Sequence, residues 1–203
     1  MNEFLNNQRI MLILKFIKPW ISAIVIVLIL RYTGALAGIS TITNTALMKV
    51  GVMDYNPTEP TLSEDFNYNF RLKDMEGNLV DFTAFKGKVV VINLWATWCA
   101  PCRVEMPSMQ SLYSKIESED IAFVILSMDR DADTSNVKTY IKKNNFTFPV
   151  FMPHGYLADQ LQADVIPTTL VLNKTGQIVN RKTGATNFDT KNFKKYLERL
   201  ASK

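Results

Sequence analysis

Apolar residues in the central part of the chain fall into short runs, separated by segments in which they recur at a helical spacing. Val89–Leu94 and Ile121–Leu126 are runs rich in β-branched residues, which is typical of strands that are buried on both faces. This alternation of strands and helices indicates an α/β domain with a parallel core, an antiparallel edge and cover on both faces. The pattern predicts a further strand at 148–151, hairpins at 70–82 and 168–181, and helices at 101–117, 133–144, 156–163 and 189–200.

The same pattern divides the chain into three parts. Residues 63–203 are predicted to form one domain, which is long enough for a self-sufficient core. Residues 40–62 are rich in Thr and Asn and include two prolines near their end, so they are predicted to be a linker or stalk. Residues 1–39 differ in character, because Trp20–Leu30 contains eleven residues of which only Ser22 is polar.

Residues 1–39 favour a cytoplasmic N-terminal tail followed by a transmembrane helix. Three basic residues precede Trp20–Leu30, and such residues stay on the cytoplasmic side of a membrane. Two alternatives stay open. A cleaved signal peptide would end at Ala35–Ala37, which has the A-x-A form of a cleavage site. A buried core helix would instead leave the protein in the cytosol, whereas the first two interpretations place its body outside.

Composition excludes several classes of function. The chain of 203 residues has a formal net charge of +4, of which residues 1–31, with four basic residues and one acidic one, carry +3. The remaining charge gives the body no electrostatic footprint for nucleic acid. The chain has one histidine, His154, and two cysteines, and these are too few ligands for structural zinc, which takes four. Asp129, Asp131 and Asp133 lack the Gly and the terminal Glu of a calcium loop, so a solvated loop is predicted there. We therefore predict neither a metal nor a cofactor.

The two cysteines, Cys99 and Cys102, follow the first buried strand and open a predicted helix. Residues three apart in a first helical turn have Cα atoms roughly 5 Å apart, within the range that a disulfide requires. Unpaired N–H groups at a helix N-terminus favour a thiolate on Cys99, and Pro101 is tolerated in the first turn. Because Cys99 lies at the exposed start and Cys102 lies deeper, Cys99 is predicted to attack and Cys102 to resolve.

The context of this motif resembles a known family. Residues 95–107, WATWCAPCRVEMP, are similar to the active-site segment of the thioredoxin superfamily and, more narrowly, of the TlpA/ResA group of membrane-tethered disulfide reductases. FTAFKGK at 82–88 and VIPT at 165–168 are also similar to that group. The resemblance covers about residues 60–203 and does not extend to residues 32–57. It implies a thioredoxin-like fold with an N-terminal β-hairpin and a central αβ insertion, here at about 133–151.

The resemblance also implies roles for residues around the cysteines. Pro167 is expected to follow a cis peptide bond that presents the backbone of Ile166 to an extended substrate. From the sequence itself, the two tryptophans at the end of the first buried strand indicate that Trp95 is buried and that Trp98 is partly exposed and contacts the substrate, with a place in the core as the alternative for Trp98. Glu105 occupies the position of an acidic residue close to the cysteine pair. A partly buried carboxylate with a raised pKa at this position would take the proton of Cys102. The alternative role for Glu105 is a favourable interaction with the helix dipole.

The function expected on these grounds is an extracytoplasmic thiol–disulfide oxidoreductase that reduces disulfides of exported proteins, with haem-free cytochrome c as one substrate that the family suggests. The dipeptide between the cysteines lacks the His of strong oxidants, which favours a potential nearer to about −270 mV than to about −120 mV. The expected partners are these substrates and a transmembrane thiol electron donor, but no nucleic acid.

The expected location is the inner membrane, with a single pass through the N-terminal helix and the redox domain on the periplasmic side. Two other functions stay open. One is a peroxiredoxin-like peroxidase, and the other is a non-enzymatic extracytoplasmic peptide-binding domain in which the disulfide is structural.

Overall fold

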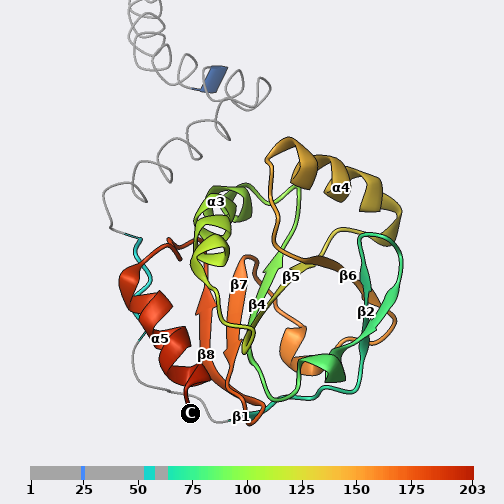
Figure 1. The fold of residues 1–203 in the computed structure, drawn as a ribbon. Helices are drawn as coiled ribbons and strands as arrows, with labels where there is room; N and C mark the ends of the chain where they lie inside the picture. Colours follow the sequence, from blue (N-terminus) through green and yellow to red (C-terminus); the bar gives the residue numbers. More distant parts are fainter. Residues whose placement is uncertain (1–23, 26–52, 58–63) are drawn as a thin grey trace, which may run out of the picture. The chain divides into compact units, whose positions relative to one another are not determined.

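The computed structural model describes residues 24–25, 53–57 and 64–203 (Figure 1). All of these except residues 24–25 belong to the unit Asn44–Lys203, with which the following description is concerned. The predicted cytoplasmic tail, nearly all of the predicted membrane helix or signal peptide, and most of the predicted linker lie outside the described residues. Among the residues that are described, no helix is both long enough and apolar enough to cross a bilayer.

Within the described part of the chain, eight strands form one mixed sheet in the order β1-β8-β7-β4-β5-β6-β2-β3. Strands β4, β5 and β6 in the middle are parallel, and antiparallel strands flank them on both sides. The strands are β1 (Glu64–Asp65), β2 (Arg71–Asp74), β3 (Leu79–Asp81), β4 (Val89–Trp95), β5 (Ile121–Ser127), β6 (Val150–His154), β7 (Thr168–Leu172) and β8 (Gln177–Thr183). The helices of this unit are α3 (Ala100–Lys115), α4 (Thr134–Lys143) and α5 (Lys191–Ala201), with 3-10 turns η1 (Phe82–Phe85), η2 (Asp131–Asp133) and η3 (Asp159–Leu161).

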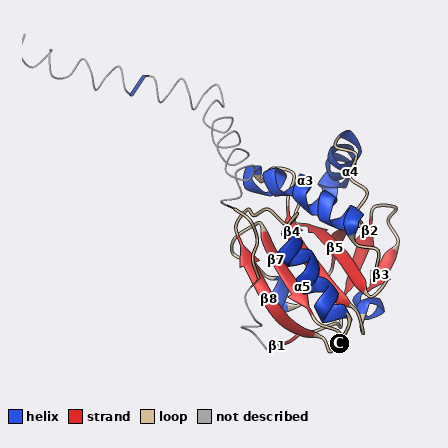
Figure 2. Cartoon of the chain, turned by 60° about the vertical axis from the view of Figure 1, so that its left-hand side comes forward, coloured by secondary structure: helices blue, strands red, loops and turns tan. Residues whose placement is uncertain are grey.

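Burial on two faces explains why β4 is apolar along nearly its whole length, since alternate residues of a strand point to opposite faces of the sheet. The odd-numbered apolar residues of β4 join a core layer that they share with α3, α4 and α5, and the even-numbered ones join a second layer. In Figure 2, α5 lies in front of the strands on the first face. The second layer is rich in aromatic side chains from the segment before β2 and from η1, namely Phe66, Tyr68, Phe70 and Phe82.

Most of the predicted elements are present. The expected N-terminal hairpin is β2–β3, and the expected central insertion supplies α4 and β6, which pairs with β5 and so extends the parallel core. The α/β class is confirmed, although antiparallel strands lie on both sides of the core instead of one. The helix predicted at 156–163 is wrong, because that segment contains only η3. So short a segment forms too few helical hydrogen bonds to offset the cost of nucleating a helix.

Residues 53–57 belong to the predicted linker but pack against the domain, and we call Met53–Pro57 the strap. Asp54 forms a parallel bridge with Asn187, and the Tyr55 N–H donates to the Asn187 carbonyl oxygen at 2.9 Å. The Tyr55 ring is buried, with its centroid 4.6 Å from that of Phe193. One aromatic residue in a polar segment has no periodicity, so the sequence pattern carries no sign of this contact.

Candidate active site

A disulfide joins Cys99 and Cys102 where β4 ends and α3 begins, and their Cα atoms are 5.3 Å apart. Cys99 is the N-cap of α3, and the Cys102 N–H donates to the Cys99 sulfur at 3.2 Å. Pro101 lies in the first turn, where its missing N–H breaks no helical hydrogen bond. The predicted corner between strand and helix is therefore present, with the two cysteines bonded to each other.

The start of α3 favours a thiolate on Cys99 once the disulfide is reduced. The Cys102 amide already points at the Cys99 sulfur, and the positive end of the helix dipole lies at the same place. Only Cys99 of the pair has any exposed surface, 5%, whereas Cys102 has none. This is the predicted order of accessibility, and the attacking and resolving roles assigned from it stay predictions.

The loop that precedes β7 lies against the disulfide. The Ile166–Pro167 peptide bond is cis, as expected, and the Ile166 carbonyl oxygen is 3.8 Å from the Cys99 sulfur. The residues that precede Cys99 and Ile166 both face solvent, since Trp98 is 70% exposed and Val165 is 55% exposed. Two apolar side chains from the segments that carry Cys99 and Ile166 therefore face solvent, and exposed apolar surface of this kind suits a bound polypeptide.

Glu105 lies one turn after Cys102 in α3 and is fully buried. Its Oε1 accepts a hydrogen bond from Asn93 Nδ2 at 2.8 Å, and its Oε2 accepts one from the Thr186 backbone N–H at 3.3 Å. Burial raises the pKa of Glu105 to about 8, and the two hydrogen bonds and the charge of Lys182 oppose this rise. The raised pKa agrees with the expectation, but the burial is complete instead of partial.

Three polar residues that were not among the predicted site residues are linked to Glu105 by hydrogen bonds, Asn93 and Thr186 directly and Thr169 through Asn93. Asn93 Nδ2 also donates to Thr169 Oγ1 at 2.9 Å, and Asn93 Oδ1 has no hydrogen-bond partner among the described residues. The sequence contains a sign that Asn93 has buried polar partners, because it is the only polar residue in the apolar run Val89–Leu94. A buried amide needs partners, and here they are a carboxyl group and a hydroxyl group.

A second buried carboxylate, Asp129, holds the loop between β4 and α3. It accepts hydrogen bonds from the Thr97 N–H at 2.9 Å, from the Thr97 hydroxyl at 2.6 Å and from the Ser127 hydroxyl at 2.7 Å. The predicted solvated loop is therefore wrong at Asp129, which is only 6% exposed. Because Thr97 lies two residues before Cys99, Asp129 contributes to the position of the reactive sulfur.

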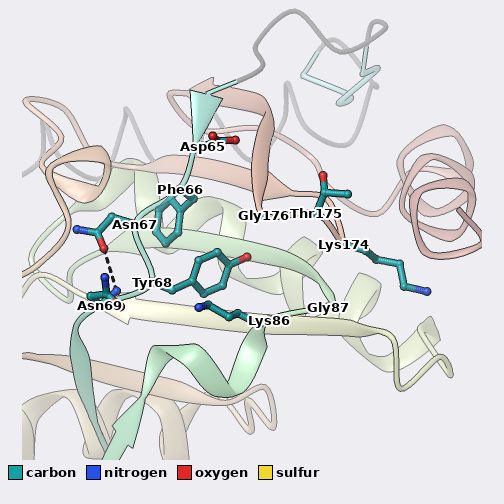
Figure 3. A pocket seen from close by; sticks show the side chains of 10 residues that line it. All are labelled: Asp65, Phe66, Asn67, Tyr68, Asn69, Lys86, Gly87, Lys174, Thr175 and Gly176. Atoms are coloured by element: carbon teal, nitrogen blue, oxygen red, sulfur yellow. Dashed lines mark hydrogen bonds between the residues drawn. The ribbon is translucent and has the colours of Figure 1, made fainter.

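A pocket of about 640 Å³ lies at the opposite end of β4 from the disulfide (Figure 3). It is lined by residues 65–69, by Gly87 just before β4 and by the β7–β8 turn at 174–176. Lys86 Nζ lies over the Tyr68 ring, 5.7 Å from its centroid. Because its lining includes none of the residues around the disulfide, this pocket is separate from the candidate active site. In the described part of the chain, no group of His, Cys, Asp and Glu side chains is arranged to hold a metal ion.

Known proteins are similar to this chain in sequence. Residues 62–197 match the Redoxin family. The thiol-disulfide oxidoreductases ResA of Bacillus cereus and Bacillus subtilis are 33% and 31% identical to this chain over 117 residues. The matched stretch is 57% of this chain, and 66% and 64% of the two relatives, so it spans slightly less than two thirds of their length.

Solved structures share the fold. StoA from Bacillus subtilis is 26% identical with a TM-score of 0.51, and the match covers 71% of this chain and 98% of StoA. A thiol:disulfide interchange protein of the thioredoxin family from Chlorobium tepidum is 26% identical with a TM-score of 0.53, covering 71% of this chain and 99% of its own. The thioredoxin-like fold and the resemblance to the TlpA/ResA group are thereby confirmed. Since the family match extends over more than half of its residues, the chain belongs to the Redoxin family.

Proposed function

We propose that this protein is a thiol–disulfide oxidoreductase that reduces disulfide bonds of other polypeptides through Cys99 and Cys102. The observation that carries the proposal is the disulfide at the N-terminus of α3, in which Cys99 is the only cysteine of the pair with any exposed surface and its sulfur lies against the Ile166 carbonyl oxygen. A structural disulfide stabilises a fold most when it closes a long loop, whereas these cysteines are only three positions apart. The ResA relatives are thiol-disulfide oxidoreductases, which supports the same reaction.

In the proposed reaction, the reduced protein supplies two electrons. The Cys99 thiolate attacks one sulfur of a substrate disulfide, so that a mixed disulfide forms, the substrate S–S bond breaks, and one substrate thiolate leaves and takes up a proton. Cys102 then loses its proton, and its thiolate attacks the Cys99 sulfur. The second substrate sulfur leaves as a thiolate, and the cysteine pair ends in the disulfide state that the structure holds.

Glu105 is proposed to accept the proton of Cys102. Its pKa of about 8 makes the Glu105 carboxylate a stronger base than an ordinary carboxylate, so it is better suited to take up a proton near neutral pH. At neutral pH about a tenth of the Glu105 carboxyl groups are ionised and ready to accept. Asn93 can hold either form, because its Nδ2 donates to the carboxylate and its unpartnered Oδ1 can accept from the acid after the amide rotates.

The proposed substrate is an extended polypeptide that lies across the accessible sulfur. Trp98 and Val165, the exposed residues that precede Cys99 and Ile166, offer it apolar contacts. The Ile166 carbonyl oxygen, next to the Cys99 sulfur, can accept a hydrogen bond from a substrate N–H. These contacts recognise backbone and apolar surface, so they suit many substrate sequences.

We further propose that the protein acts outside the cytoplasm, held at the inner membrane by its N-terminal segment. The support comes from the sequence, in which basic residues precede the apolar run Trp20–Leu30. The substrates would then be disulfides of exported proteins, haem-free cytochrome c among them. A dithiol in an oxidising compartment has to be reduced again after each turnover, so the proposal includes a transmembrane thiol electron donor.

The proposed reaction is tested by following the turbidity of insulin as its disulfides are reduced. With dithiothreitol as the electron donor, the protein should accelerate precipitation well beyond the rate with dithiothreitol alone, and it should leave hydrogen peroxide unconsumed. Peroxide consumption without insulin reduction would establish the peroxidase alternative. Activity toward neither substrate would contradict both enzymatic functions and leave peptide binding.

The two cysteine roles are tested by trapping in cells. Cys102→Ser leaves the first mixed disulfide without a resolving thiol, so this variant should accumulate covalent complexes with substrates, whereas Cys99→Ser should not. The complexes are detected on non-reducing gels and disappear on reduction. Equal trapping by the two variants would show that the roles are assigned wrongly.

A further inference from the structure

We propose that the strap, Met53–Pro57, positions the backbone amide of Thr186 on Glu105 and so sets the pH range over which the cysteine pair exchanges disulfides. The inference rests on the proposed function and adds a role for a segment that precedes residues 62–197, the part of the chain that matches the Redoxin family. Thr186 is then a positioning residue, because it acts on the thiols only through Glu105.

The strap holds the loop that follows β8 through its own backbone. The Met53 carbonyl oxygen accepts hydrogen bonds from the Thr186 hydroxyl at 2.7 Å and from the Asn187 N–H at 2.8 Å. The Tyr55 N–H donates to the Asn187 carbonyl oxygen at 2.9 Å. These three bonds bracket Thr186 and Asn187, so the path of the loop at these two residues depends on the docked strap.

Side chains hold the strap in place. The Tyr55 ring is buried, with its centroid 4.6 Å from that of Phe193 and 5.6 Å from that of Phe188, and its hydroxyl donates to Asn180 Oδ1. The Tyr55 carbonyl oxygen accepts a hydrogen bond at 2.9 Å from the hydroxyl of Thr190, the N-cap residue of α5. A buried ring with its polar groups satisfied is an anchor that one substitution can remove.

Thr186 connects this anchor to the active site. Its N–H donates to Glu105 Oε2 at 3.3 Å, whereas the shorter bond to the same carboxyl group, 2.8 Å, comes from Asn93 in the middle of the sheet. Ser108 of α3 also holds the loop, because its hydroxyl donates to the Thr186 carbonyl oxygen at 3.5 Å and accepts from the Phe188 N–H at 3.1 Å. The strap makes the shorter bond to Thr186, 2.7 Å, and the bond to Glu105 that it helps to position is the longer of the two.

The direction of the effect follows from the chemistry of the carboxyl group. A hydrogen bond from an N–H group stabilises the ionised form, so the Thr186 amide lowers the pKa of Glu105. The charge of Lys182 on β8 also lowers it. The cysteine pair lies on the same helix as Glu105, β4 contributes the uncharged Asn93, and β7 contributes Thr169, which bonds to Asn93. Releasing the strap should therefore raise the pKa of Glu105. The pH range in which Glu105 can take the proton of the resolving thiol would then move to higher pH.

The test is the titration of the Glu105 carboxyl group, followed by ¹³C NMR in the full chain with the disulfide intact. Thr186→Val removes the hydroxyl that donates to Met53 and keeps the backbone amide, and Thr186→Ser keeps the hydroxyl as the matched control. We expect the midpoint to rise by about half a pH unit or more in Thr186→Val and to stay at the parent value in Thr186→Ser. Tyr55→Leu removes the buried anchor and should raise the midpoint in the same direction.

An unchanged midpoint in both Thr186→Val and Tyr55→Leu, with both variants folded by circular dichroism, overturns the inference. Insulin reduction separates this result from a failure of the proposed function. If the parent protein reduces insulin but neither substitution changes the Glu105 midpoint, only the role of the strap is contradicted and the proposed reaction stands. A shifted midpoint in a protein without reductase activity supports the role of the strap and contradicts the proposed reaction.

Discussion

At the scale of single residues, a buried carboxyl group makes the stability of this fold depend on pH. Glu105 has a pKa of about 8 in the folded protein, raised by burial from an ordinary value of 4.5. Between these two values the unfolded chain has released a proton that the folded chain keeps, so the free energy of unfolding falls as the pH rises. The contribution is fully present below pH 4.5 and is lost as the pH passes through about 8.

Glu105→Gln should remove this pH dependence, because glutamine keeps the shape and does not titrate. Relative to the variant, the parent should lose stability at about 1.4 kcal/mol per pH unit between roughly pH 5 and pH 7.5, as measured by urea unfolding. The same variant should slow the release of substrate from the Cys99 mixed disulfide, because glutamine accepts no proton. Glu119→Gln, in an exposed turn, is the control for removing a carboxyl group. Parallel stability curves for the parent and Glu105→Gln would show that Glu105 does not titrate in this range.

At the scale of secondary-structure elements, the position of the disulfide depends on residues outside its own motif. The Met128 N–H donates to the Trp95 carbonyl oxygen at 2.7 Å, and the Asp129 carboxylate accepts from the N–H and the hydroxyl of Thr97. The segment after β5 thus holds the end of β4 and the first residues of the loop that leads to Cys99. The geometry of the N-cap therefore rests on contacts between neighbouring strands as well as on the helix itself.

Asp129→Asn should weaken this connection. The hydroxyl groups of Thr97 and Ser127 can rotate to meet an amide, but the Thr97 N–H loses an acceptor if the amide nitrogen faces it. We expect a loss of about 1–3 kcal/mol in the free energy of unfolding, together with slower insulin reduction. Asp131→Asn is the matched control, because Asp131 pairs with Lys73 at a site where its side chain is 69% exposed, so its loss should cost about 1 kcal/mol or less. Equal losses in the two variants would contradict a special role for Asp129.

At the scale of the whole molecule, the proposed function requires that the domain is exported. Alkaline phosphatase folds only where its disulfides can form, so a fusion of it after Lys203 should be active, and the same fusion without residues 1–39 should be inactive. Carbonate-washed membranes should retain the full-length chain. A mature N-terminus at Gly38 would establish the cleaved signal peptide instead, and an inactive full-length fusion in the cytoplasm would contradict both forms of export.

The sequence by itself determined most of the elements and the reactive pair, because both depend on local patterns. The apolar run of β4, the helix that starts at Cys99 and the spacing of the two cysteines depend on residues within a few positions of one another. The opposite environments of Trp95, which is buried, and Trp98, which is exposed, follow from the same local corner. The cis bond before Pro167 was expected only because the segment resembles a family, and the structure confirms it.

The tertiary structure decided the partners of the polar residues, because these contacts join positions that no periodicity connects. The Thr186 amide reaches Glu105 across 81 positions, Asp129 reaches Thr97 across 32, and the Met53 carbonyl oxygen meets Thr186 across 133. A pattern of apolar and polar residues shows which side chains tend to avoid water. It does not show which distant group forms a hydrogen bond with a given polar side chain. Only the packed chain shows that the two carboxyl groups near the disulfide are buried, and burial is what gives Glu105 its raised pKa.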